Sequence, residues 1–254
     1  YILDFIHKEK IDDSGVYMDS NYLTGSYIKS KVKTGDPKVF YFRQNSAASH
    51  IDICDMKKTN FENAKILDVS GITAALSKSS QEACFWAIEK AQQCKMKVTF
   101  DPNIRRNLWK SEEEMRSVLN RIAFRSEIIL PGIAEGKILT KKERVEDIAD
   151  FYSEKGVQVV VIKLGALGAY YKTSDGVGAY VKGFSVSRVI DTIGAGDAFA
   201  SGFLSGILEN LSIHDSVVRG NAMGAIIVTS KTDNHDVPTK LELEEYLEHV
   251  RLLA

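Results

Sequence analysis

The chain has 254 residues, a near-neutral formal charge of −1 at pH 7 and 44% hydrophobic residues. A chain of this length can bury one sizeable core, and α/β folds of this size often form a single domain. Lys and Arg are spread along the sequence, which argues against a nucleic-acid partner, and no apolar run approaches the length of a membrane span. Cys54, Cys84 and Cys94 form no C-x-x-C pair, so we expect free thiols and a cytoplasmic protein.

Residues 15–43 contain short runs rich in Tyr, Val and Ile that are separated by glycine turns. This pattern predicts a small β-sheet built from hairpins, which follows a helix end at the start of the chain. Strand alternation places Tyr41 and Arg43 on one face of the last run and Phe40 and Phe42 on the other. Taken alone, Tyr41 and Arg43 also fit an ordinary solvated strand face.

From Lys65 onward, strand patterns and helix patterns alternate. Strands are predicted at 65–71, 96–103, 127–132 and 158–165, and helices at 77–94, from 111, at 133–155 and from 239. Such alternation predicts an α/β fold with a doubly wound, mainly parallel sheet, right-handed crossovers and helices on both faces. Ligands of such sheets bind at the carboxyl ends of the strands. We therefore expect functional residues directly after predicted strands.

The stretch 189–210 joins an apolar run to a helix through a turn that contains Gly194 and Gly196. A glycine turn that opens a helix leaves backbone N–H groups without partners at the positive end of the helix dipole, and such a site attracts phosphate. Asp197 lies inside this anion site. It fits either an acid that is merely favoured in a first helical turn or a base that takes a proton from a substrate hydroxyl during phosphoryl transfer.

The sequence of this turn, D-T-I-G-A-G-D-A-F at Asp191–Phe199, resembles the C-terminal signature of the ribokinase-like (PfkB) carbohydrate kinases. The resemblance implies that Asp197 is the catalytic base. It also implies a backbone anion hole formed by Gly194, Ala195 and Gly196.

The same resemblance implies a single ribokinase-like kinase domain over residues 1–254. In this family, strands such as those of 15–43 form a β lid over the sugar and often a dimer contact, so we expect a homo-oligomer that assembles through the lid. Family members begin with a strand and a glycine-rich sugar-binding segment that this sequence does not contain, so we expect an N-terminal segment to be missing. ATP and Mg²⁺ are implied as cofactors, and Asp191 and Ile193 match positions that help to hold a monovalent cation in some relatives.

The segment F-D-P-N-I-R-R-N-L-W, at the predicted strand end near 103, closely resembles the 2-keto-3-deoxygluconate kinase branch of the family. The resemblance implies that Arg105 contacts the substrate and that Asn103 lies near the ATP phosphates. A guanidinium can hold a carboxylate through two hydrogen bonds, which a neutral hexose would not require. Without the resemblance, the neighbouring Arg105 and Arg106 would be assigned to the solvated surface.

Other short matches to this branch imply further substrate contacts. Y-I-K at Tyr27 and Y-F-R at Tyr41 to Arg43 supply two tyrosines and an arginine, which contact the sugar acid in that branch. Asp233, ahead of V-P-T, loosely matches a late acidic residue that touches substrate hydroxyls. By itself Asp233 also fits an ordinary loop carboxylate.

Two further motifs concern the nucleotide and the metal. K-L-G-A-L-G-A, which starts at Lys163, resembles the family's nucleotide-proximal loop, although a hairpin turn explains its glycines equally well and no Walker A sequence is present. The implied ATP contacts, besides Asn103, are Lys163, Gly165, Ala166, Gly168 and Asn221. Glu135 matches the acid of an N-x-x-E motif that helps to organise Mg²⁺. However, Gly132 replaces the Asn of that motif, and Glu135 also fits a first-turn acid.

Together these matches lead to the hypothesis of an ATP-dependent kinase that converts 2-keto-3-deoxygluconate to its 6-phosphate. One alternative is a kinase of the same family that acts on a neutral sugar such as fructose. An alternative of another class is a non-catalytic sugar- or nucleotide-binding protein. Arg43 and Arg105 discriminate between the two kinases, because a sugar acid needs a cationic partner and a neutral sugar does not.

Overall fold

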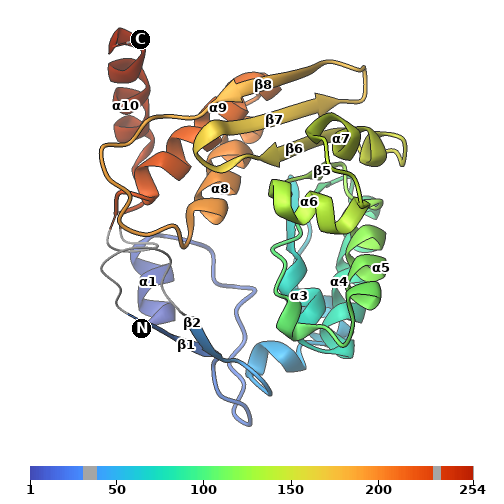
Figure 1. Cartoon of the computed structure of the whole chain (residues 1–254). Helices are drawn as coiled ribbons and strands as arrows, with labels where there is room; N and C mark the ends of the chain where they lie inside the picture. The colour runs from blue at the N-terminus through green and yellow to red at the C-terminus, as the bar shows by residue number, and fades with distance from the viewer. Residues whose placement is uncertain (31–38, 231–235, 254) are drawn as a thin grey trace.

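The computed structural model describes residues 1–30, 39–230 and 236–253. Its centre is a six-stranded sheet in the order β3-β4-β5-β6-β7-β8, and a separate two-stranded sheet pairs β1 with β2 (Figure 1). The strands are β1 (Ser26–Lys29), β2 (Val39–Phe42), β3 (Ile66–Ser70), β4 (Lys97–Asp101), β5 (Ile128–Ile129), β6 (Val159–Lys163), β7 (Gly168–Thr173) and β8 (Gly178–Lys182). The helices are α1 (Ile2–Lys8), α2 (Ile53–Lys58), α3 (Gly71–Leu76), α4 (Lys78–Gln93), α5 (Glu112–Ala123), α6 (Ile133–Thr140), α7 (Val145–Ser153), α8 (Ala195–Leu208), α9 (Ile213–Ile227) and α10 (Lys240–Leu253).

The central sheet is parallel in one half and antiparallel in the other. β3, β4, β5 and β6 pair in parallel, whereas β7 and β8 follow β6 as antiparallel neighbours. The predicted α/β sheet is therefore confirmed as a mixed sheet, and each of the four predicted strand regions contains one of the parallel strands. The carboxyl ends of these strands meet at one edge, where β4 ends at Asp101 and β6 ends at Lys163.

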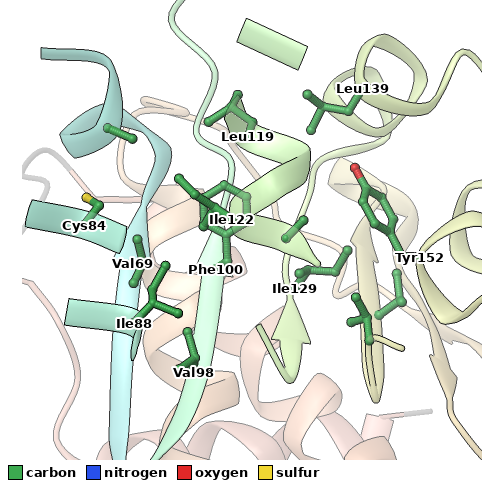
Figure 2. Packing of buried hydrophobic residues seen from close by; sticks show 14 of the residues in the cluster. Val69, Cys84, Ile88, Val98, Phe100, Leu119, Ile122, Ile129, Leu139 and Tyr152 are labelled. Carbon is green, nitrogen blue, oxygen red and sulfur yellow. The ribbon is translucent and has the colours of Figure 1, made fainter. Parts of the chain in front are cut away.

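Helices cover both faces of this sheet, as the alternation predicts (Figure 1). Val160 and Ile162 of β6 belong to a cluster that contains residues of α4, α5 and α7, whereas Val161 belongs to the opposite cluster with α8 and α9. All three side chains are 0% exposed. Figure 2 shows the first cluster, in which Phe100 of β4 and Ile122 of α5 lie near the centre. Burying an apolar side chain of this size stabilises a fold by about 1.5–3 kcal/mol.

Side-chain caps fix where the predicted helices begin. Ser77 accepts a hydrogen bond from the backbone N–H of Ser80 at 3.0 Å, and α4 starts at the next residue, as predicted. Ser111 caps α5 in the same way, through the N–H of Glu114 at 3.1 Å. The Glu114 carboxylate, however, accepts from the N–H of Lys110 at 3.3 Å. A reciprocal box between Ser111 and Glu114 is therefore only half formed.

The sequence pattern does not predict α3, which brings the end of β3 against the loop after β4. Its first residue, Gly71, lies so close to that loop that a Cβ would be 2.0 Å from the carbonyl oxygen of Pro102. Glycine alone lacks that atom, so Gly71 permits this approach. The contact supports the loop that carries Asn103 and Arg105.

The β1–β2 sheet, which we call the lid, stands apart from this core (Figure 1). Its register pairs Tyr27 with Tyr41 and Ile28 with Phe40, so the predicted alternation of faces is confirmed for the described strands. Phe40 is 56% exposed and Phe42 is 58% exposed. Within the described ranges, no helix combines the length and apolarity needed to cross a membrane.

Candidate functional site

Two adjoining pockets lie at the carboxyl end of the parallel strands. The first, of about 300 Å³, is bounded by the loop after β6, the segment after β8, and helices α8 and α9. The second, of about 320 Å³, is bounded by the loop after β4, the start of α8 and the lid residue Tyr41. Lys163, Thr192 and Gly196 line both pockets. A group bound in one pocket can therefore reach a group bound in the other.

The start of α8 lies where the two pockets meet. Gly194 precedes the helix with φ +82° and ψ −12°, a left-handed conformation that glycine adopts without strain. Its carbonyl accepts from the N–H of Ala198 at 2.8 Å, which begins the helix. The first N–H groups of such a helix have no carbonyl partner within it and carry the positive end of its dipole. Asp197 lies in this first turn, is exposed, and lines the second pocket.

A largely buried ion pair lies at the same junction. Lys163 Nζ lies 2.5 Å from Asp101 Oδ2, and the two side chains are 17% and 10% exposed. Asp101 Oδ1 accepts from the N–H of Asn103 at 3.1 Å. A Cβ built on Gly196 would lie 3.6 Å from Lys163 Nζ, so the ammonium group sits beside the start of α8. Because Asp101 balances the ammonium charge, the pair fixes Lys163 beside the helix N-terminus without adding net positive charge there.

Asp68 of β3 is part of this polar group. Its Oδ1 accepts from the hydroxyl of Thr99 at 2.5 Å. Desolvation raises the pKa of Asp68 and outweighs the Thr99 hydrogen bond, while the nearby carboxylates of Asp101 and Asp197 act in the same direction as desolvation. The carboxylates of Asp101 and Asp197 are therefore close enough to act on Asp68.

Glu135 ties two parts of the second pocket together. Its Oε2 accepts from the N–H of Gly132 at 2.8 Å, which places it in the first turn of α6 as a capping residue. Its Oε1 accepts from the N–H of Ile104 at 2.7 Å, in the loop after β4. The interpretation as a first-turn acid is confirmed, and Glu135 also positions the loop that carries Asn103 and Arg105. Among the residues that the structure describes, no group of three or more His, Cys, Asp or Glu side chains is arranged to hold a metal.

The adjacent arginines after β4 lie in different surroundings. Arg105 lines the second pocket, and its Nη1 donates to the carbonyl of Ile104 at 3.0 Å. The Arg106 side chain is 66% exposed, and its Nη2 lies 3.8 Å from Glu112 Oε2. Without the family resemblance, both arginines would be assigned to the solvated surface. That assignment is correct for Arg106, whereas Arg105 lies in the second pocket.

The lid face with Tyr27, Tyr41 and Arg43 adjoins the second pocket. The ring centroids of Tyr27 and Tyr41 are 6.0 Å apart, and the Arg43 guanidinium carbon lies 4.0 Å from the Tyr41 centroid. Desolvation lowers the pKa of Arg43, Tyr41 opposes this effect, and the positive charge of Arg105 adds to it. Arg43 Nε and Nη2 are buried, and no group in the described part of the chain accepts a hydrogen bond from them. Buried donors without acceptors are costly, and Arg43 lies beside the second pocket without lining it.

The first pocket is lined mainly by small residues and backbone. The turn between β6 and β7, residues 165–168, is the predicted hairpin turn and also forms part of the pocket wall. Asn221 of α9 lines the pocket as well, but its side-chain nitrogen donates to the carbonyls of Val181 at 3.2 Å and Lys182 at 3.3 Å. Asn221 therefore holds β8 against α9 while it shapes the pocket.

The predicted site residues in the described ranges all lie at these pockets or on the adjoining lid face. Those that line the first pocket are Lys163, Gly165, Ala166, Gly168, Ala195, Gly196 and Asn221. Those that line the second are Tyr41, Asn103, Arg105, Glu135, Lys163, Gly194, Gly196 and Asp197. Tyr27 and Arg43 flank Tyr41 on the lid. Asp233 lies outside the described residues.

The sequence patterns do not identify every polar residue at this site, and Lys29 and Thr192 are two examples. Lys29 Nζ lies 2.5 Å from Asp191 Oδ2, and Thr192 lines both pockets. Strand alternation could have found Lys29, because it stands two residues after Tyr27 and therefore on the same face. For Thr192 the only available signal was its place next to the glycine turn.

Comparisons with known proteins give one consistent result. Residues 1–240 match the model of the pfkB family carbohydrate kinases. The 2-dehydro-3-deoxygluconokinase of Bacillus subtilis strain 168 is 42% identical over 249 residues, which cover 97% of this chain and 76% of that protein. The 5-dehydro-2-deoxygluconokinase of Clostridium beijerinckii is 31% identical over 263 residues, with 97% and 76% covered. A solved fructokinase variant of Vibrio cholerae O395, with fructose, ADP and a potassium ion bound, aligns with a TM-score of 0.88 at 25% identity, covering 97% of this chain and 80% of that chain.

Proposed function

The chain belongs to the pfkB family of carbohydrate kinases and has their ribokinase-like fold, and we propose that it uses ATP to phosphorylate 2-keto-3-deoxygluconate at the 6-hydroxyl. The observation that carries the choice of a sugar acid is the guanidinium of Arg105, which lines the second pocket. A ligand carboxylate would accept two hydrogen bonds in the paired geometry that a guanidinium prefers. Arg43, whose guanidinium carbon lies 4.0 Å from the centroid of the Tyr41 ring, adds a second positive charge. The similarity to a 2-dehydro-3-deoxygluconokinase, a kinase of this same compound, supports the proposal.

In the proposed reaction the sugar acid occupies the second pocket and ATP the first. Asp197 accepts the proton of the attacking hydroxyl. The backbone N–H groups of 194–196 hold the negative charge of the transferred phosphoryl group. Lys163, which lines both pockets, faces the ATP phosphates. Phosphoryl transfer depends mostly on positioning and electrostatics, and these groups all stand on elements of the buried sheet and its helices.

The proposal includes Mg²⁺ bound to the ATP phosphates. Mg²⁺ commonly keeps several waters and takes the rest of its ligands from one or two carboxylates and from phosphates. Both Glu135 oxygens already accept a backbone hydrogen bond, but a carboxylate has further lone pairs, so Glu135 is proposed to hold a metal-bound water. The bound ion supplies neutralisation of phosphate charge. Asp191, considered above for a monovalent cation, pairs with Lys29.

The experiment is a coupled assay of ADP release over a panel of sugar acids and neutral hexoses. The panel includes 2-keto-3-deoxygluconate, its galactonate epimer, 5-keto-2-deoxygluconate, fructose and ribose. We expect 2-keto-3-deoxygluconate to give the highest kcat/KM and a 6-phosphate product by phosphorus NMR. Preferred turnover of fructose would contradict the sugar-acid assignment, and binding without turnover of any sugar would favour the non-catalytic alternative.

We also propose that two copies associate through the lid. The lid face that points away from Tyr27 and Tyr41 carries Ile28, Phe40 and Phe42, which are 61%, 56% and 58% exposed. A cluster of exposed apolar side chains marks a protein contact surface. Sedimentation velocity should give a dimer for the wild-type chain and a monomer for Phe40→Ser with Phe42→Ser. A wild-type chain that sediments as a monomer at micromolar concentration would contradict this proposal.

Residues 1–254 are proposed to act as one kinase domain, with 15–43 contributing the lid. The family match over residues 1–240 supports this division. The cytoplasm is the proposed location, because Cys54, Cys84 and Cys94 are all free thiols, as is usual in a reducing compartment.

A further inference from the structure

One ion pair connects the lid to the segment that precedes α8. Lys29 of β1 places its Nζ 2.5 Å from Asp191 Oδ2, and the two residues are 162 positions apart in the sequence. Their side chains are 26% and 15% exposed. By contrast, the pair between Lys137 and Glu143 has side chains that are 42% and 83% exposed. The Lys29–Asp191 pair is therefore screened less by water and salt than an ordinary surface pair.

Asp191 connects the lid to the start of α8 through a second hydrogen bond. Its Oδ1 accepts from the N–H of Ile193 at 3.0 Å. Ile193 directly precedes Gly194, whose left-handed φ of +82° opens the helix. On the other side, the N–H groups of Ile190 and Asp191 donate to the carbonyl of Val228 at 2.8 and 3.4 Å. The segment that precedes α8 is thus fixed by hydrogen bonds to the end of α9 and by the ion pair with the lid.

The charge on Asp191 is maintained in this setting. Burial opposes ionisation of the carboxyl group. The hydrogen bonds from Lys29 and from the backbone N–H groups of Ile193 and Thr192, together with the charge of Lys29, outweigh burial and lower the pKa of Asp191. Loss of the lysine would leave a largely buried carboxylate without its counter-charge. Removing one partner of a buried pair is costly for that reason, and the loop would relax to expose the carboxylate.

The lid therefore has two contacts with the site. Tyr27 and Lys29 project from the same face of β1, two residues apart. We propose that Lys29 is a positioning residue, whose ammonium group fixes the loop from Asp191 to Gly194, so that the lid that contacts the sugar also sets the geometry of the anion hole. This inference rests on the proposed function, in which the backbone after Gly194 holds the phosphoryl group.

Steady-state kinetics give the first part of the test. In Lys29→Ala we expect kcat to fall by up to about 100-fold, since a misplacement of about 1 Å can cost that much, while the Kd for ATP stays unchanged. Asp191→Asn should give the same loss, and the double variant should be no worse than either single variant because the two residues act as a unit. Lys29→Arg, which keeps the charge, should retain most of the turnover. Lys137→Ala, which breaks the exposed pair with Glu143, is the matched control with unchanged kcat.

Two further measurements report on the loop rather than on overall folding. Ethylammonium chloride should restore turnover to Lys29→Ala, because it supplies the missing ammonium group, whereas tetramethylammonium chloride at the same concentration should not, because it has no N–H donor. Hydrogen exchange of the peptide that covers 191–198 should be faster in Lys29→Ala than in the wild type, without ligand, while the peptides of α5 stay unchanged.

An unchanged kcat in Lys29→Ala, or a loss confined to the KM of the sugar, would overturn this inference. So would a loss of kcat with unchanged exchange at 191–198 and no restoration by ethylammonium. The exchange comparison needs no substrate, so it tests the role of Lys29 even if the proposed substrate is wrong. Conversely, a wild-type chain that turns over the sugar acid while Lys29→Ala is unaffected would reject this inference alone. If Lys29→Ala fails to fold, Asp191→Asn carries the kinetic and exchange tests.

Discussion

The start of α8 and the lid hold their functional groups in opposite ways. α8 is fixed by the core, where Phe203 is 0% exposed and Phe199 is 5% exposed between the sheet and α9. The groups that α8 contributes are backbone N–H groups, whose direction follows from the helix itself. The lid is a two-stranded ribbon in which Tyr27 is 49% exposed and Phe40 is 56% exposed. It contributes side chains instead.

This difference implies that phosphoryl transfer and sugar recognition can be changed separately. Apart from the proposed link through Lys29 and Asp191, the backbone groups at the helix N-terminus depend on the fold and not on neighbouring side chains. An isolated two-stranded sheet is only marginally stable in water, so the lid tolerates substitution without disturbing the core. Changes at α8 should therefore affect turnover of every sugar, whereas changes at Arg43 and Tyr41 should alter which sugar is used.

The largest expected effect is at Asp197. In Asp197→Asn we expect kcat to fall by about 10²–10⁴, the usual contribution of a positioned base, while the Kd for ATP and the unfolding midpoint stay near the wild-type values. Steady-state kinetics and calorimetric titration of ATP measure these quantities. Asp215→Asn is the matched control, because Asp215 is also an acid in the first turn of a helix but lies outside both pockets.

Equal losses in the two variants would mean that Asp197 acts only as a first-turn acid. A near-normal kcat in Asp197→Asn would exclude it as the base. Either result would contradict the division of roles in which the start of α8 carries out catalysis and the lid determines which sugar is used.

Substitutions in the core and in the lid should lower the free energy of unfolding by very different amounts. Phe203→Ala removes a fully buried ring, and we expect the free energy of unfolding to fall by about 3–5 kcal/mol. Phe40→Ala removes a ring that is 56% exposed, and a surface change of this kind usually stays within about 0.5 kcal/mol. Urea unfolding at a protein concentration below the dimer range measures both. A large loss in Phe40→Ala would show that the lid is part of the core.

Sequence patterns predict the structure best in segments where burial dictates a regular spacing of apolar residues. The apolar run that contains Val160 to Ile162 is β-branched because its strand is covered on both faces. Ser77 and the turn at Gly194 mark helix starts through local hydrogen bonding and backbone conformation, which neighbouring residues decide. These features depend on a few consecutive residues, so they are visible in the sequence.

Contacts between distant segments are not predictable in this way. The pairs Lys29–Asp191 and Lys163–Asp101 join residues on elements that only the tertiary fold brings together. The hydrogen bond from the N–H of Ile104 to Glu135 likewise links two loops, and it gives Glu135 a structural role that its motif does not reveal. Glycine is needed at position 71 because a carbonyl 31 positions later approaches it, and no local pattern encodes that approach.

The two adjacent arginines offer a sharper comparison within one loop. Arg105→Met should reduce kcat/KM for a sugar acid by about 10- to 100-fold, because a hydrogen bond to a charged group contributes about 1.5–3 kcal/mol. Arg106→Met should leave it unchanged, because the Arg106 side chain is exposed and its guanidinium lies beside Glu112. The reduction should be small for any neutral sugar that the enzyme accepts at a low rate. Equal effects on acidic and neutral sugars would assign Arg105 to loop structure instead of substrate recognition.

The smallest effect concerns the cysteines and leaves activity unchanged. Burial raises the pKa of the Cys84 thiol to about 12, so Cys84 in the folded core carries almost no reactive thiolate at pH 8. Cys54, on the α2 helix that follows the lid, is exposed. A chromogenic disulfide reagent at pH 8 should therefore label Cys54 quickly and Cys84 only after urea unfolding, and the singly labelled protein should keep its kcat. Rapid labelling of Cys84 in the native protein would show that the core around α4 opens readily. The proposed contrast between a rigid core and an exposed lid would then be wrong, because the core itself would not be rigid.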